Sequence, residues 1–208
     1  MPTRAEVIQA LQFPGLYDLA PINTTADGRY RLTYQFETSQ PPDLWYDYSG
    51  WTAFSEAEKA AFRSALSTVE EFLNVEFVEV TRDRDPDFNF GKIDLPPQYL
   101  ALGGPQYSTL NGRITRYDGF AVFDRSIDLA SGEQGLILHE VGHALGLDHP
   151  FDGVALDPDF DTNHYTIMSY TDDPTPGIGE TSRMMVYDFV ALQDIWGATA
   201  SNAGDTAY

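Results

Sequence analysis

The order of apolar and polar residues along this chain changes its period several times, which predicts a mixture of strands and helices. Residues 31–37 alternate as a half-buried strand does, with Leu32 and Tyr34 on the apolar side. Two further apolar runs, at 75–80 and 88–93, also predict strands. The pattern therefore indicates a sheet that is assembled from the first half of the chain.

Residues 95–124 give a weaker and more interrupted pattern. Several Pro and Gly residues fall within 95–112, which predicts a loop. Residues 114–124 are apolar again, and Gly119 in their middle predicts two short strand pieces rather than one strand.

Helical periods begin at recognisable caps. Residues 4–11 form a short helical pattern near the N-terminus. Ser55 and Glu58 have the spacing of a capping box, and the long helix that follows carries a continuous apolar stripe. Ser131 and Gln134 repeat that spacing before a strongly apolar turn, which predicts the start of a buried helix there.

Three of the four histidines lie in one string, His139-Glu140-x-x-His143-x-x-Gly146-x-x-His149. His139 and His143 are four residues apart, so on a helix both imidazoles lie on one face, one turn apart. Gly146 tolerates the left-handed conformation that ends helices, which allows the chain to bend and bring His149 back. Because neutral imidazoles are good ligands for Zn²⁺, the string predicts a zinc site in preference to a structural histidine cluster.

Glu140 makes the predicted zinc site a catalytic one. It follows His139 directly, so it projects roughly 100° around the helix and lies beside the metal. A carboxylate in that place suits a general base acting on zinc-bound water. A purely structural zinc site has no need of it and usually has four protein ligands. A zinc hydrolase is therefore favoured, and a zinc-stabilised binding module without turnover is the alternative.

The extended string resembles the zinc motif of the metzincin metallopeptidases, and later residues narrow the resemblance to the serralysin branch. Pro150 follows the third histidine, and residues 165–170, with the sequence Tyr-Thr-Ile-Met-Ser-Tyr, are similar to the Met-turn of that branch. Residues 188–198 are similar to the closing helix of serralysin catalytic domains. The resemblance is strong over residues 131–208, weaker over 29–130 and absent before them.

The resemblance implies roles for residues outside the string. Met168 would form an apolar floor beneath the zinc ligands. Tyr170 would be a further zinc ligand that swings away during the reaction and stabilises the oxyanion. In metzincins the edge strand before the zinc helix binds substrate in extended form. The candidates for that strand by position are Gly119, Phe120, Ala121, Val122 and Phe123.

The implied fold class is α+β, with a twisted, mixed but mostly parallel sheet and long helices. Residues 29–208 would be the catalytic domain, with the zinc cleft between an N-terminal lobe at 29–149 and a smaller, irregular C-terminal lobe at 150–200. Residues 1–28 would be an N-terminal arm or the remnant of a pro-segment, which opens the alternative of a latent enzyme. Residues 201–208 would begin a calcium-repeat region.

Charge restricts the partners. The formal net charge of −20 argues against nucleic acids and anionic membranes, because both need a basic surface. No run of about 18 apolar residues is present, so no membrane span is predicted. No apolar stretch follows Arg4, which predicts no classical signal peptide. The resemblance implies a secreted, extracellular monomer that acts on proteins or peptides and leaves the cell by type I secretion.

Zinc is the cofactor that the string predicts, and calcium is a second cation to consider. Asp83, Asp85 and Asp87 alternate within one turn of the chain. Their spacing is not that of an EF-hand loop, so a solvated turn is favoured over a calcium site. The chain has no cysteine, which excludes disulfides and a cysteine-based zymogen lock.

Overall fold

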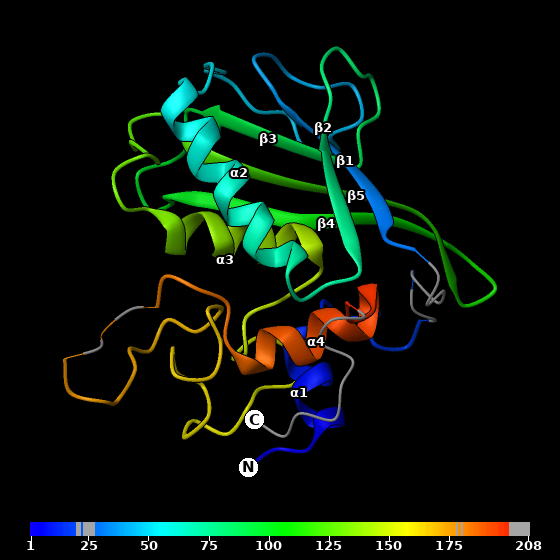
Figure 1. The fold of residues 1–208 in the computed structure, drawn as a ribbon, viewed down its shortest axis with the longest axis vertical. Coiled ribbons are helices and arrows are strands. Elements are labelled where there is room, and N and C mark those ends of the chain that lie inside the picture. The colour runs from blue at the N-terminus through cyan, green and yellow to red at the C-terminus, as the bar shows by residue number, and fades with distance from the viewer. Residues whose placement is uncertain (20–21, 23–27, 178, 180, 200–208) are drawn as a thin grey trace.

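The computed structural model describes residues 1–19, 22, 28–177, 179 and 181–199 (Figure 1). The predicted calcium-repeat start at 201–208 lies outside the described residues. The mixed α/β class with a mainly parallel sheet is confirmed. The elements in chain order are α1 (Arg4–Leu11), β1 (Tyr30–Phe36), α2 (Glu56–Glu70), β2 (Val75–Glu79), β3 (Phe88–Ile93), β4 (Ala101–Leu110), β5 (Arg113–Asp124), α3 (Gln134–Leu145) and α4 (Val186–Trp196).

The five-stranded sheet has the order β2-β1-β3-β5-β4. Its pairs are parallel except for β4, which runs antiparallel to β5 at the sheet edge. Two predictions are wrong here: residues 95–112 contain the long strand β4, and β5 continues through Gly119 without a break. Pairing between β4 and β5 overrides the local Gly and Pro signals, and an edge strand tolerates Pro105 because its outer side needs no N–H donor.

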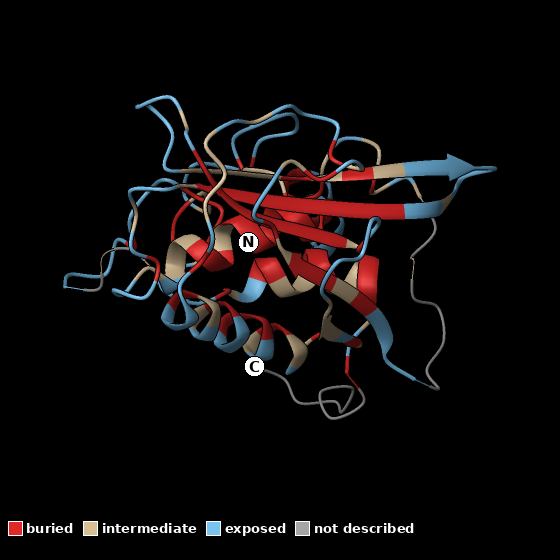
Figure 2. Cartoon of the chain, turned by 90° about the horizontal axis from the view of Figure 1, so that it is seen from above, coloured by how far each residue is buried: buried red, intermediate tan, exposed pale blue. Residues whose placement is uncertain are grey.

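The two faces of the sheet are covered differently. Helices α2 and α3 pack on one face, where their apolar stripes meet Phe88, Phe90 and Phe123 in the main core (Figure 1). On the other face a smaller apolar cluster lies beneath the loop 38–51, and its buried members are Leu44, Ile93, Phe120 and Val122. Viewed from above, the central strands are buried along most of their length (Figure 2).

The helix starts confirm one predicted cap and contradict another. Ser55 and Glu58 form the predicted capping box, since the Glu58 N–H donates to Ser55 Oγ at 3.2 Å and the Ser55 N–H donates to Glu58 Oε2 at 2.7 Å. Ser131 does not cap α3, which begins after Glu133 without a side-chain cap. The Ser131 hydroxyl donates instead to the Asp128 carboxylate at 2.5 Å, and that bond removes it from the helix start.

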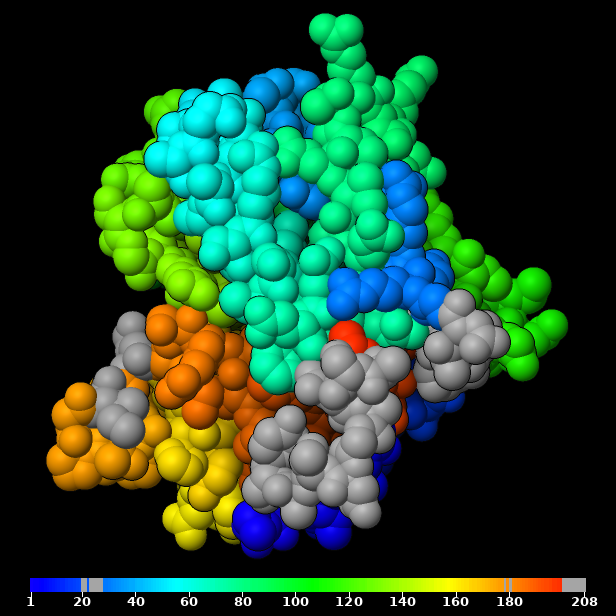
Figure 3. Space-filling view, in the orientation of Figure 1, coloured from blue at the N-terminus to red at the C-terminus, as the bar shows by residue number. Residues whose placement is uncertain are grey.

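The described part of the N-terminal segment 1–28 is built into the core. Helix α1 packs against α4, below the sheet in Figure 1, and its residues Val7 and Leu11 belong to the main core. The last residue of α1 binds the end of the zinc string, because the Asp148 N–H donates to Leu11 O at 2.8 Å. Figure 3 shows the irregular segments 150–185, in yellow and orange, below the sheet at the surface.

Candidate active site

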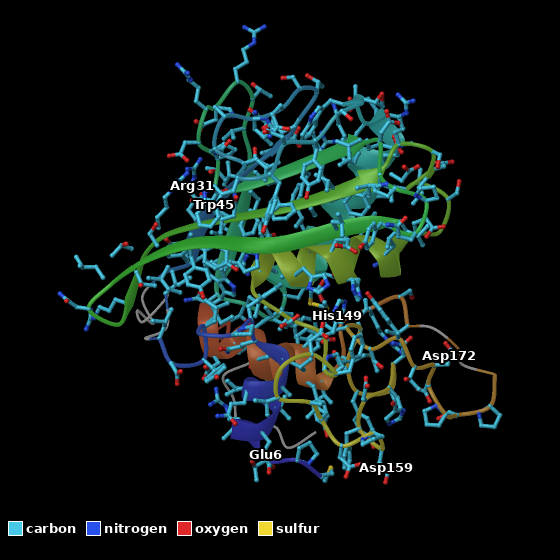
Figure 4. All side chains as sticks on the ribbon, turned by 180° about the vertical axis from the view of Figure 1, so that it is seen from behind. Glu6, Arg31, Trp45, His149, Asp159 and Asp172 are labelled. Carbon is cyan, nitrogen blue, oxygen red and sulfur yellow. The ribbon has the colours of Figure 1, made fainter. Side chains whose placement is uncertain are left out.

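The predicted helix break brings the three histidines together. Helix α3 carries His139 and His143 and ends at Gly146, which has the left-handed φ of 112° and donates its N–H to the last turn. The chain then turns back, so that His149 lies between α3 and the segments below the sheet (Figure 4). One ring nitrogen from each histidine lies within 4.8 Å of the others, as a shared metal requires.

Each histidine has a partner on its Nδ1 atom, which leaves Nε2 for a metal. His139 Nδ1 lies 2.9 Å from Ile167 O, and His143 Nδ1 lies 2.7 Å from Leu147 O. His149 Nδ1 lies 3.0 Å from a carboxylate oxygen of Asp152. These acceptors place the proton on Nδ1, the arrangement that commonly orients metal-binding histidines.

The Nε2 atoms of His143 and His149 face each other at 3.1 Å. With both protons on Nδ1, neither Nε2 can donate to the other, so two lone pairs meet and a cation between them would satisfy both. Burial lowers the pKa of His139 to about 4, and that of His143 well below its usual value. The neutral imidazoles that result are the form that binds zinc, so these residues fit a zinc ion.

Glu140 lies beside the histidines in an unusual environment. Its side chain is only 5% exposed, and its Oε2 has no hydrogen-bond partner among the described residues. Burial raises the pKa of Glu140 to about 8. The space around it is fixed by Gly103 of β4, because a Cβ at that glycine would lie 2.9 Å from Glu140 Oε2. A buried carboxylate held close to a metal site is suited to accept and return a proton.

The predicted Met-turn lies directly beneath the histidines. Met168 is fully buried, and its Sδ packs so closely against Gly142 that a Cβ there would lie 2.9 Å away. The carbonyl of the preceding residue, Ile167, is the partner of His139 Nδ1. The turn therefore contacts the zinc string through both an apolar surface and a polar one.

Asp188 fixes this turn, and the sequence analysis did not identify that role. Its buried carboxylate accepts hydrogen bonds from the Ile167 N–H at 2.9 Å, the Met185 N–H at 2.6 Å and Thr166 Oγ1 at 2.6 Å. Burial raises its pKa to about 6, although these donors oppose the shift. An Asp in the first turn of a helix ordinarily indicates dipole compensation, so the only available signal was its apolar surroundings in the sequence.

Tyr170 closes the cluster on its solvent side. Its hydroxyl lies 2.9 Å from His149 Nε2, and the residue is 71% exposed. Burial of its ring edge, together with the charge of Glu140, raises the pKa of Tyr170. The fourth histidine, His164, stands apart and pairs with Asp173 at 2.9 Å.

A pocket of about 600 Å³ opens next to this cluster. His139, Glu140 and Tyr170 line it together with the chain leading into β4, including Leu100 and Ala101, and with the loop around Thr181. The pocket therefore extends from His139 and Glu140 to the free edge of the sheet. None of the described residues of the N-terminal segment lines it.

The predicted substrate strand, residues Gly119 to Phe123, is wrong in its position. These residues pair with β3 on one side and with β4 on the other, so their backbone groups are already used. The edge strand next to the zinc string is β4, which the sequence pattern assigned to a loop. Among the described residues, no further strand pairs with the outer side of β4.

No family model matches the chain, but curated relatives are similar to it over most of its length. It is 29% identical over 199 residues to a serralysin of Photorhabdus luminescens, an alignment that covers 86% of this chain and 41% of that protein. Serralysin A of Dickeya chrysanthemi is 31% identical over 200 residues, covering 85% and 40%. Metallopeptidase AprA of Pseudomonas marginalis is 28% identical over 210 residues, covering 88% and 43%.

The mixed α/β fold and the three converging histidines are consistent with the metzincin class of zinc proteins. Within that class the relatives support a serralysin-like catalytic domain. The chain spans 41% of the length of the first of these relatives. No described helix is long and apolar enough to cross a membrane.

Proposed function

We propose that this chain is a zinc-dependent endopeptidase domain that hydrolyses peptide bonds of extracellular proteins. One observation carries the proposal: the ring nitrogens of His139, His143 and His149 converge beside the buried, unpartnered carboxylate of Glu140, at the wall of a pocket. The names of the relatives, serralysin and metallopeptidase, support the same activity. A binding module without turnover is not favoured, because it gives Glu140 no purpose.

The three histidines would hold zinc through Nε2, with their Nδ1 protons donated to Ile167 O, Leu147 O and the Asp152 carboxylate. Zinc in such a site acidifies water and polarises a carbonyl group. Met168 would support the ligands from below. These roles remain proposals that rest on the geometry and on the resemblance.

Glu140 would take the proton of the attacking water and deliver it to the leaving amine. Its burial suits both steps, because a raised pKa makes a carboxylate a stronger base. Gly103 would keep the strand close enough to hold the carboxylate in place, since any side chain there would meet it. A bound metal cation would favour the charged carboxylate, so the working pKa would lie below that of the metal-free site.

Substrate would bind along β4 in extended form. The outer edge of β4 and residues 98–101 before it lead into the pocket that Glu140 and His139 line. Backbone pairing with a free sheet edge is a common way to bind an extended peptide. Secretion, a monomeric state and the division into lobes at 29–149 and 150–200 belong to the same proposal, and all of them rest on the resemblance.

Metal removal tests the activity directly. We expect the chain to cleave casein or gelatin, to lose this activity in a zinc chelator and to regain it when zinc is added back, because the proposed reaction needs the metal. The measurement is the cleavage rate, with metal content determined in parallel. A chain that binds zinc with its histidines but cleaves neither protein would support the binding module instead.

Tyr170→Phe tests the proposed oxyanion role. We expect it to reduce kcat by about 10²-fold while KM changes little, because loss of one oxyanion donor acts mainly on the transition state. Because Tyr170 is 71% exposed, the fold should tolerate this change, and Tyr30→Phe, remote on β1, serves as the matched control. An unchanged kcat would remove Tyr170 from the mechanism.

A further inference from the structure

A second group of charged side chains lies on the other face of the sheet. Asp118 of β5 points to the face that α2 and α3 do not cover, as its neighbour Phe120 does. Asp43 reaches it from the loop 38–51, and Asp85 from the loop before β3. One carboxylate oxygen from each lies within 4.8 Å of the others. We call these three residues, together with Asn89 of β3, the Asp118 cluster.

Several oxygens in the Asp118 cluster have no partner. Asp118 is 2% exposed and Asn89 is 1% exposed, yet the Oδ1 atom of each lacks a hydrogen bond among the described residues. Asp43 Oδ1 is buried and unpartnered as well. The Asn89 amide points into the group, because its Nδ2 donates to Asp43 Oδ2 at 3.0 Å. Buried oxygens without donors are costly, so this arrangement calls for a cation.

The protein itself supplies only part of the positive charge that would balance the three carboxylates of the Asp118 cluster. Arg116 contacts Asp85 and, at 3.2 Å, Asp118 Oδ2, while Gln106 Nε2 lies 3.4 Å from the same oxygen. The Arg116 guanidinium thus pairs with two of the three carboxylates, and it approaches Asp118 from the Oδ2 side. Burial, followed by the charge of Asp43, raises the pKa of Asp118 to about 8 despite Arg116.

We propose that the Asp118 cluster binds a calcium ion through the carboxylates of Asp43, Asp85 and Asp118, with Asn89 Nδ2 holding Asp43 in place. Carboxylate and amide oxygens are the ligands that Ca²⁺ prefers, and it accepts irregular geometry. The carboxylate of Asp85 is 65% exposed, which provides a route from solvent and room for water ligands. Bound calcium would tie the loop 38–51 to β3 and β5. Figure 4 shows Trp45 of that loop above the strands and His149 below them, so this site is separate from the zinc site.

Thermal unfolding of the zinc-loaded, 208-residue chain tests the proposal. At a calcium concentration 100-fold above Kd we expect Tm to rise by roughly 5–10 °C, because the ion binds only the folded state. Asp118→Asn should abolish the rise, since it removes a buried charged ligand at nearly constant volume. Asp159→Asn, an exposed aspartate elsewhere, should keep the full rise. Should Asp118→Asn not fold, Asp43→Asn at the half-buried loop position is expected to lose the rise in the same way.

Terbium luminescence locates the ion. Tb³⁺ replaces Ca²⁺ at oxygen sites. Trp45 can sensitise it, because the Trp45 backbone N–H donates to Gln106 Oε1 at 2.7 Å and Gln106 Nε2 lies 3.4 Å from Asp118 Oδ2. We expect calcium-displaceable luminescence in the wild type and in Asp159→Asn, and none in Asp118→Asn. Wild type without a calcium-dependent rise in Tm, or an equal rise in Asp118→Asn, would overturn the proposal. Neither readout depends on peptidase activity, so the result is independent of the proposed function.

Discussion

Glu140→Gln is expected to lower kcat/KM for peptide cleavage by about 10²–10⁴-fold, the usual contribution of a general base. Glutamine has nearly the same shape and fills the same buried space next to Gly103, but it cannot accept a proton. The replacement also removes the ionisable charge from this buried site, so the fold should be retained. Zinc content should be unchanged, because the histidines are untouched.

The measurement is hydrolysis of a fluorogenic peptide at saturating zinc, with metal content and thermal unfolding recorded on the same preparations. Glu76→Gln is the matched control, since Glu76 is an exposed residue of β2 remote from the pocket. Turnover of Glu140→Gln near the rate of that control, with zinc bound, would refute the role of Glu140. If Glu140→Gln loses zinc as well as activity, Glu140 is needed for metal binding rather than as a general base.

The zinc string could be interpreted from the sequence because its geometry is local. A helix fixes the positions of His139, Glu140 and His143, and one left-handed glycine fixes the return to His149. The capping box of Ser55 and Glu58 is equally local, and it was predicted to the residue. Elements whose hydrogen bonds close within a few residues leave their pattern in the sequence.

The strand β4 was missed because its structure is set by hairpin pairing with β5, across the turn at Asn111 and Gly112, and not by the alternation of its own residues. Gly103, Gly104 and Pro105 favour a loop locally, but pairing along β5 determines the structure. Gly103 is also required by the site, because Glu140 leaves no room for a side chain at that position. Because β4 was not predicted, β5 was taken for the edge strand. The substrate strand was therefore placed on β5 when the free edge belongs to β4.

Two buried aspartates were missed for a related reason. Asp118 and Asp188 each lie in stretches where an acidic residue has an ordinary explanation, a strand surface or a helix N-terminus. Their burial depends on how other segments pack around them, Asp43 and Asn89 near Asp118 and residues 166–167 at Asp188, so only the tertiary structure gives them a role. For Asp188 that role is the support of the Met-turn.

Asp188→Ala is expected to lower the free energy of unfolding by about 3–5 kcal/mol, the cost of leaving buried polar partners of a charged group unpaired. The variant deprives the Ile167 N–H, the Met185 N–H and Thr166 Oγ1 of their common acceptor. The same turn presents Ile167 O to His139 Nδ1, so its loosening should reach the metal. Loss of an outer partner of this kind typically weakens metal binding 10- to 100-fold.

Asp194→Ala is the matched control, because Asp194 lies on the same helix but pairs with the exposed Arg4. Its second partner, Gln12 Nε2 at 3.3 Å, keeps its bond to Ala191 O in this variant. An exposed ion pair contributes about 0–1 kcal/mol, so this variant should unfold nearly as the wild type does and bind zinc equally well. Chemical unfolding with and without zinc separates the two effects. If Asp188→Ala loses no more stability than Asp194→Ala, the Met-turn is held by its apolar packing around Met168 and not by the carboxylate. If Asp188→Ala loses stability but binds zinc as tightly as the wild type, then the position of Ile167 O does not depend on Asp188. In that case α3 alone orients His139.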